Sequence, residues 1–258
     1  MYLGNFLKHC SNLLFPQACH ACNNICHNYL CTDCVQLLNF YTRENICPIC
    51  ANPFELLREI DKYSSFNCNF CLDNDFSFIH TFVLFEHSLE LKTLIYAIKN
   101  GNIPLLKYLA KELAIKYKSN ILNTHNDRNT NNTFPDLIIP VPISKNKLYK
   151  RGYNQSLIIA KILSKGLDIP YANNILYINN TQKKHTRSQH LLSSNNRAIG
   201  LDYAINLAMK YRIDGLNVLL VDDVITTCAT VAEISRILLD NGAKSVANAV
   251  LAKTNYYA

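Results

Sequence analysis

The chain shows two patterns of apolar and polar positions, and the change falls near residue 74. After it, short apolar runs alternate with segments whose apolar residues recur every three or four positions, which indicates strands alternating with helices. Runs without internal polar positions indicate strands buried on both faces, as in a parallel sheet. A polar, asparagine-rich stretch over residues 119–133 is expected to be a surface loop. We expect an α/β domain with strands over residues 78–84, 136–142, 174–178, 203–207, 218–221 and 246–252, and helices over residues 90–99, 103–117, 156–165 and 231–240.

Residues 1–73 have no comparable runs and are organised around cysteine instead. Ten of the eleven cysteines lie before residue 72. A gap of two residues lets both sulfurs of a pair face one tetrahedral ion, so two such pairs complete a four-cysteine zinc site. We predict two structural zinc ions, with sequential pairing as the simpler arrangement and interleaved pairing as the alternative. The pairs are Cys19/Cys22, Cys31/Cys34, Cys47/Cys50 and Cys68/Cys71.

Disulfide bonds and redox chemistry are the other interpretations of these pairs. Disulfides fit poorly with a chain whose start has no secretory-signal pattern, and redox pairs normally occur singly on a βαβ unit. A segment of about 70 residues with few aliphatic side chains has little core of its own, so zinc would contribute folding energy directly. We therefore predict a zinc-binding domain over residues 1–73 and a second domain over residues 74–258.

The most specific functional pattern lies in residues 218–230. Four apolar residues lead into Asp222 and Asp223, two more apolar residues follow, and a hydroxyl-rich loop then opens the helix predicted next. Open α/β sheets bind ligands at the carboxyl ends of their strands, and a helix N-terminus favours a phosphate group. Carboxylates beside a phosphate cradle suit a phosphorylated sugar.

This stretch resembles the phosphoribosyl pyrophosphate (PRPP) motif of type I phosphoribosyltransferases. The resemblance implies the fold of that family, a mostly parallel sheet flanked by helices, with the acidic pair on the ribose hydroxyls and the loop around the 5′-phosphate. The family usually has glycine at position 228, where φ > 0 lets the backbone approach the phosphate, so Cys228 is expected to strain or weaken the loop. The implied site binds PRPP with Mg²⁺ through Asp222, Asp223, Thr226, Thr227, Cys228, Ala229 and Thr230.

Two further segments narrow the resemblance. Residues 140–143 (Pro-Val-Pro-Ile) and 151–155 (Arg-Gly-Tyr-Asn-Gln), together with the cysteine pairs, are similar to the signature of the ComF/GntX family of competence-type proteins. That resemblance implies a pyrophosphate loop after residue 140 and a mobile lid over residues 179–196. A solvated basic loop is the alternative for the charged residues, and a helix cap is the alternative for Asn154. The positions suggested for the pyrophosphate loop and lid are Val141, Pro142, Arg151, Arg187 and Arg197.

Charge and hydropathy limit the partners only loosely. The formal net charge of +7 is a modest bias towards anions or nucleic acid, and two four-thiolate zinc sites would lower it to about +3. The sequence contains no run of about 18 apolar residues and no signal-peptide pattern at its start. We expect a cytoplasmic protein without membrane insertion.

Two functions are compatible with these patterns. The first is a PRPP-binding, phosphoribosyltransferase-like protein in which a nucleophile would displace pyrophosphate from the ribose, although the residues identify neither an acceptor nor a catalytic group. The second is a non-enzymatic role in DNA uptake and natural transformation, which the family resemblance allows, with zinc knuckles and a cationic face holding single-stranded DNA beside the uptake machinery. The two can coexist, with PRPP as a regulatory ligand.

Overall fold

A four-stranded parallel sheet forms the centre of the molecule. The strand order is β3 (Thr81–Phe85), β8 (Ser245–Lys253), β7 (Asn217–Ile225) and β4 (Leu137–Pro140). The central strands β7 and β8 are buried over most of their length, which explains why most of their residues are apolar. The computed structural model describes residues 17–26, 28–38, 46–53, 68–74, 76–85, 88–124, 134–179, 204–207 and 212–254.

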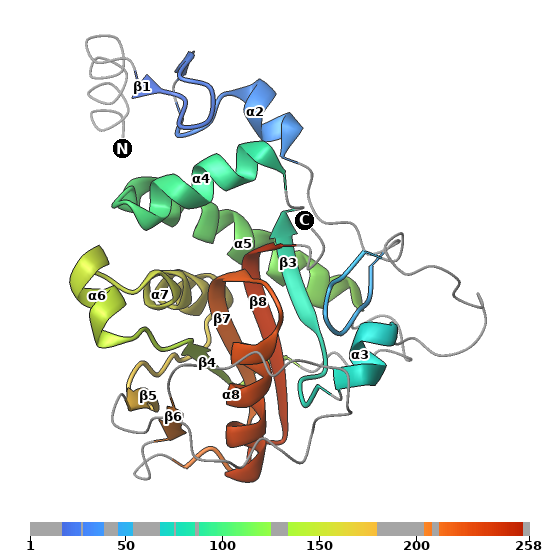
Figure 1. Ribbon diagram of the computed structural model, residues 1–258. Coiled ribbons are helices and arrows are strands. Elements are labelled where there is room, and N and C mark those ends of the chain that lie inside the picture. The colour runs from blue at the N-terminus through green and yellow to red at the C-terminus, as the bar shows by residue number, and fades with distance from the viewer. Residues whose placement is uncertain are drawn as a thin grey trace.

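Helices cover both faces of this sheet (Figure 1). Leu219 and Val221 of β7 face the cluster that α4, α5 and α7 complete, whereas Val218 and Leu220 face the cluster that contains α8. Successive residues of a strand point to opposite faces, so β7 joins two separate helical layers. The predicted α/β class is confirmed. The bounds of the helices are α4 (Leu89–Lys99), α5 (Ile103–Thr124), α7 (Gln155–Leu167) and α8 (Ala229–Asp240).

The loop predicted over residues 119–133 is wrong for its first part, because α5 continues to Thr124. Tyr117 and Ile121 are 2% and 3% exposed and lie in the same apolar cluster as the earlier residues of α5. These two buried contacts extend the helix through residues of low helix propensity, because tertiary packing outweighs local preference. Residues 125–133 lie outside the described part of the chain.

A short helix, α6 (Lys145–Arg151), follows β4 where a basic loop was the expected alternative. The Ser144 hydroxyl accepts a hydrogen bond from the Lys147 N–H (3.4 Å), and Gly152 ends the helix with a left-handed backbone at φ 78°. No residue of α6 is buried. A serine cap and a terminal glycine, not an apolar face, therefore define this helix.

The cysteine-rich part contributes short elements at the edge of the domain. They are β1 (Gln17–Ala18) paired with β2 (Ile25–Cys26), α2 (Thr32–Leu37) and α3 (Asn69–Asn74), and a separate antiparallel pair joins β5 (Leu176–Asn179) to β6 (Ala204–Leu207). In Figure 1, β1 and α2 lie beyond α4, whereas α3 lies beside β3. Across the described ranges, no helix is both long enough and apolar enough to cross a membrane.

Candidate functional site

Several predicted site residues meet where β4 ends beside Val221 of β7. Val141 directly follows β4, and its N–H donates to the Val221 carbonyl (2.9 Å). The side-chain amide of Asn154 donates to the Val141 carbonyl (3.1 Å), so the start of α7 lies next to the end of β4. Asp222 and Asp223 come next in β7. The loop after β4 and the acidic pair are therefore neighbours at the carboxyl edge of the sheet, where α/β sheets bind ligands.

The two carboxylates of the acidic pair have different surroundings. Asp222 Oδ1 accepts hydrogen bonds from the Ser156 hydroxyl (2.7 Å) and from the Asp223 N–H (2.9 Å). Burial, and then the negative charge of Asp223, raise the pKa of Asp222 to about 7. Asp223 is 9% exposed, and its Oδ2 atom has no hydrogen-bond partner among the residues that the structure describes. A buried carboxylate oxygen without a partner is costly, and a ligand hydroxyl or a cation would supply one.

A pocket of about 50 Å³ lies immediately after the acidic pair. It is lined by Asp222 and by residues 224–231, so six of the seven positions predicted for PRPP border it. The pocket reaches the N-terminus of α8, which no side chain caps. Free backbone N–H groups and the positive end of the helix dipole make this end of α8 suitable for a phosphate.

Cys228 takes the left-handed backbone expected at this position, with φ 62° and ψ −4°. The conformation costs a residue with a β-carbon about 1–2 kcal/mol relative to glycine. The side chain is 2% exposed, and burial raises the pKa of its thiol to about 11, so the thiol is neutral at pH 7. Its sulfur lies 3.9 Å from the Cys50 carbonyl, to which it donates. The pocket loop is thus in contact with the cysteine-rich part of the chain.

Lys253 also lies at this site, although no local sequence pattern predicts it there. It ends β8 at 1% exposure, and its ammonium group donates to the Thr226 carbonyl and to the Thr254 carbonyl (3.2 Å). The register that pairs Ile225 with Lys253 brings this cation beneath the loop. A lysine at a strand end is ordinarily solvated, and only the partner strand shows that this one is enclosed.

The other predicted positions that the structure describes do not line this pocket. Arg151 ends α6 and donates to the Gln155 side chain (3.3 Å), and Pro142 is half-buried next to Val141. Asn154 is the N-cap of α7, since its side chain accepts from the Ser156 N–H (3.0 Å), so its cap role is confirmed. The lid positions Arg187 and Arg197 lie outside the described residues.

The eight paired cysteines form two groups, as the sequential arrangement predicts. The first cysteine site comprises Cys19, Cys22, Cys31 and Cys34, and the second cysteine site comprises Cys47, Cys50, Cys68 and Cys71. In each group all four sulfurs lie within 4.8 Å of one another. None of the ten cysteines in the described ranges forms a disulfide.

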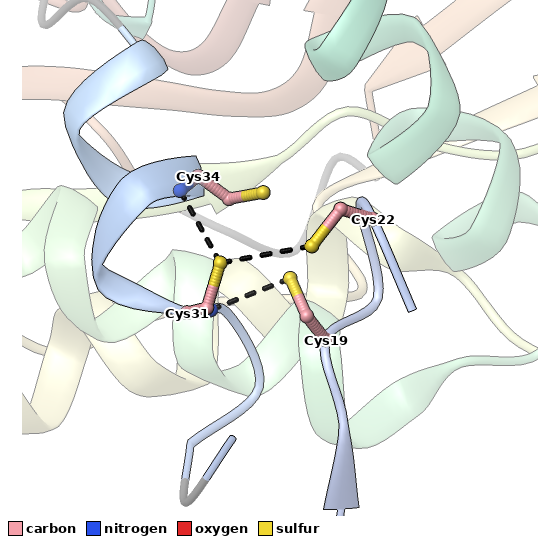
Figure 2. A group of neighbouring side chains, drawn as sticks. All are labelled: Cys19, Cys22, Cys31 and Cys34. Carbon is pink, nitrogen blue, oxygen red and sulfur yellow. Dashed lines mark hydrogen bonds between the residues drawn. The ribbon is translucent and has the colours of Figure 1, made fainter. Parts of the chain in front are cut away.

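The sulfur geometry of both groups fits tetrahedral zinc. Bonds of about 2.3 Å to a tetrahedral ion place the sulfurs about 3.8 Å apart. The Cys22 and Cys31 sulfurs are 3.7 Å apart in the first site. There the Cys31 N–H also donates to Cys19 Sγ (3.3 Å), and Figure 2 shows the four sulfurs facing a common centre. In the second site the sulfur distances are 3.6 Å for Cys47/Cys71 and 3.4 Å for Cys50/Cys68.

Comparison with known proteins agrees with this arrangement. The sequence profile described as phosphoribosyl transferase domain matches residues 154–257, and the profile described as double zinc ribbon domain matches residues 10–72. A purine phosphoribosyltransferase structure from Pyrococcus horikoshii aligns at 15% identity and a TM-score of 0.34, over 58% of this chain and 89% of that one. At that score the superposition is loose, and the fold assignment rests on the profile and the parallel sheet. The chain is therefore a phosphoribosyltransferase-type domain preceded by a double zinc ribbon.

Two curated relatives extend over nearly the whole chain. Competence protein F of Haemophilus influenzae is 30% identical over 88% of this chain and 92% of its own length. DNA utilization protein YhgH of Escherichia coli (strain K12) is 28% identical over 91% of this chain and 96% of its own length. This chain belongs to the ComF/GntX family of competence-type proteins, as its motifs suggested.

Proposed function

We propose that this protein binds PRPP with Mg²⁺ at the carboxyl end of β7 and acts in the handling of DNA taken up by the cell. The observation that carries the proposal is the pocket lined by Asp222 and residues 224–231, which opens at the uncapped N-terminus of α8. The names of the relatives, competence protein F and DNA utilization protein, support a role connected with DNA. A cytoplasmic location and a division of the chain into residues 1–73 and 74–258 are parts of the same proposal.

Each group at the pocket has a role that its surroundings suit. The N–H groups at the start of α8 and the hydroxyls of Thr226, Thr227 and Thr230 would hold the 5′-phosphate. Asp223, through its unpartnered Oδ2, would accept from a ribose hydroxyl, and Asp222 would do so in its ionised form. Mg²⁺ would neutralise charge on the pyrophosphate near residues 141–142.

Binding of PRPP can be measured by isothermal titration calorimetry with Mg²⁺ at pH 8. We expect saturable binding to the wild type and none to the double variant Asp222→Asn, Asp223→Asn. The control is Glu233→Gln with Asp240→Asn, which removes the same charge from the exposed face of α8. Zinc content should be the same in all three proteins. Absence of binding to both the wild type and Cys228→Gly, the residue usual in the family, would refute the proposal.

A second function, binding of single-stranded nucleic acid, is favoured by α6. Its seven residues carry Lys145, Lys147, Lys150 and Arg151, none of which forms an ion pair within the part of the chain that is described. Tyr149 between them is 93% exposed. Cations that contact phosphates and an exposed ring that stacks on a base are the combination by which proteins bind single strands. The helix begins four residues beyond the loop at Val141, so both anion-binding surfaces lie on the same edge of the sheet.

Fluorescence anisotropy of a labelled oligothymidine tests this second function. We expect affinity to fall steeply as salt rises and Tyr149→Ala to weaken binding by about 1–3 kcal/mol. Lys147→Gln with Lys150→Gln should also reduce the salt dependence. Lys244→Gln is the control, since Lys244 is exposed just before β8, at the opposite edge of the sheet. Binding that all these variants retain would exclude α6 as the contact surface.

A further inference from the structure

The loop at residues 226–230, for which we proposed phosphate binding, is called the phosphate loop below. It is in direct contact with the second cysteine site. Cys228 and Cys50 are 178 positions apart in the chain, yet the Cys228 sulfur lies 3.9 Å from the Cys50 carbonyl oxygen. Both residues are almost fully enclosed, at 2% and 0% exposure. The contact therefore lies inside the protein and joins the loop before α8 to the turn that carries two of the four sulfurs.

The second cysteine site is built into the core beneath the loop. Its four cysteines are at most 6% exposed and share one apolar cluster with Val231 and Ile234 from the first turns of α8. The turn between Cys47 and Cys50 also bonds to the central sheet, since the Thr81 N–H donates to the Pro48 carbonyl (3.3 Å). A change in the shape of this turn would consequently reach the start of α8.

The backbone at Cys228 needs support from its surroundings. A left-handed residue with a β-carbon is strained, and such strain persists only where neighbouring structure holds it. On one side, the Lys253 ammonium group donates a hydrogen bond to the Thr226 carbonyl. On the other side, the Cys228 thiol donates to the Cys50 carbonyl. The first cysteine site lies in the other apolar cluster, with α4 and α5, and so is separated from this loop by the sheet.

We propose that the second cysteine site positions the phosphate loop through Cys228, so that metal in this site and a phosphate ligand at residues 226–230 strengthen each other's binding. The identity of the ligand rests on the proposed function, whereas the coupling rests on the contact between Cys228 and Cys50. Linkage requires the effect to be reciprocal: whatever factor the metal adds to the affinity for the ligand, the ligand adds to the affinity for the metal.

The test is the release of zinc from the full-length protein into a chromogenic chelator, with and without PRPP and Mg²⁺. We expect two phases. Cys22→Ser removes the one exposed ligand of the first cysteine site and so identifies the phase that belongs to that site. PRPP should slow the second site's phase about fivefold or more and leave the first site's phase unchanged. In Cys228→Ala this protection should disappear. Cys26→Ala is the matched control, since Cys26 belongs to neither site and its thiol donates to the Asn28 carbonyl (2.7 Å).

Release without ligand separates this inference from the proposed function. Faster release from the second site alone in Cys228→Ala supports the contact even if PRPP fails to bind, in which case only the choice of ligand is wrong. Unchanged release from that site in Cys228→Ala overturns the inference. If calorimetry shows PRPP bound while neither phase slows, or while only the first site's phase slows, the coupling is likewise overturned.

Discussion

The two cysteine sites have the same four-sulfur composition and very different surroundings. In the first, Cys22 is exposed and Cys31 is half-buried, whereas Cys19 and Cys34 are buried in the apolar cluster that contains α4 and α5. The Asn102 amide lies 2.9 Å from the His20 ring nitrogen, and Tyr29 packs against His20 and Tyr108 with ring centroids 5.9 and 5.8 Å away. The first site is thus attached to the helical layer by its two buried cysteines and by aromatic and polar contacts of neighbouring side chains.

The second cysteine site is part of the core itself. All four of its cysteines are buried, and its turn contacts both the sheet at Thr81 and the phosphate loop at Cys228. The same spacing motif thus occurs once with an exposed cysteine at the edge of the protein and once fully buried beside the loop before α8. Which role a zinc knuckle takes depends on what packs against it, and the spacing alone does not contain that information.

The largest effect expected from this comparison is on stability. Cys47→Ser should remove one zinc ion and lower the free energy of unfolding by about 4 kcal/mol or more, because buried sulfurs would lose their shared cation. That corresponds to roughly 10 °C in Tm for a domain of this size. Cys22→Ser should also remove one zinc ion but cost much less. Zinc content and thermal melting measure both effects, and equal losses of Tm would contradict the asymmetry.

The free energy of unfolding should also depend on pH, through Asp222. The pKa of Asp222 is about 7 in the folded protein and near 4 when unfolded, so the folded state holds the proton more tightly. The stability that this proton contributes is complete below about pH 4 and is lost as pH rises through 7. Asp222→Asn should therefore be the more stable protein at pH 8, by on the order of 4 kcal/mol, and the two proteins should differ little at pH 4. Denaturant titrations at the two pH values measure this, and a larger advantage at pH 4 would contradict it.

On the side of the first cysteine site, Tyr29 provides the contrast. Tyr29→Ala should lower the free energy of unfolding by about 2 kcal/mol, because a half-buried ring between His20 and Tyr108 is removed. The affinity for PRPP should not change, since this contact lies on the opposite face of the sheet from α8. Melting and calorimetry on one preparation test both parts. A loss of PRPP affinity in Tyr29→Ala would mean that the two regions are coupled.

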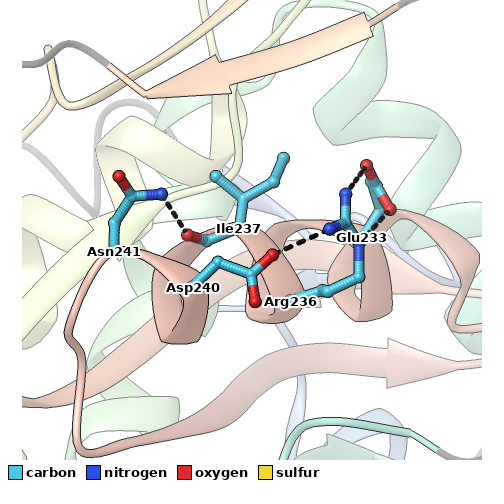
Figure 3. Close-up of polar contacts among 5 residues, drawn as sticks. All are labelled: Glu233, Arg236, Ile237, Asp240 and Asn241. Carbon is cyan, nitrogen blue, oxygen red and sulfur yellow. Dashed lines mark hydrogen bonds and ion pairs between the residues drawn. The ribbon is translucent and has the colours of Figure 1, made fainter. Parts of the chain in front are cut away.

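The smallest effect is expected on the exposed face of α8. Arg236 donates to Glu233 (2.9 Å) and to Asp240 (2.8 Å), and the Asn241 amide donates to the Ile237 carbonyl (2.7 Å) (Figure 3). Such surface pairs contribute little, so Arg236→Gln should change stability by less than about 1 kcal/mol. PRPP affinity should again be unchanged. Val231 and Ile234, which share an apolar cluster with the second cysteine site, lie on the other, buried face of α8. A large loss of PRPP affinity in Arg236→Gln would therefore show that α8 as a whole supports the loop, and not its contact with the second cysteine site.

The sequence was sufficient for the features that depend on local pattern. The apolar run before Asp222 identified β7, and the two-residue cysteine spacing identified both metal sites. Local signals for α6 were also present, because Ser144 and Gly152 are ordinary helix caps. The residues between these caps form no apolar face, and the structure shows that α6 buries none of them.

The remaining features depend on packing between distant segments. Lys253 lies beneath the loop because of the register between β7 and β8, and Tyr117 and Ile121 extend α5 because they pack against its neighbours. The contact of Cys228 with Cys50 joins positions that no local pattern relates. The sequence indicated a strained loop at Cys228. It did not indicate which neighbouring residues hold the strained backbone in place.

We propose that the second cysteine site, and not the first, supports the loop at residues 226–230. Replacement of both zinc ions by ¹¹³Cd gives an NMR signal for each site, which Cys22→Ser assigns, and PRPP with Mg²⁺ is then titrated into the protein. We predict that the signal of the second cysteine site shifts with saturation while that of the first stays in place. A shift of the first signal alone, or saturable binding of PRPP with neither signal moving, would contradict the claim.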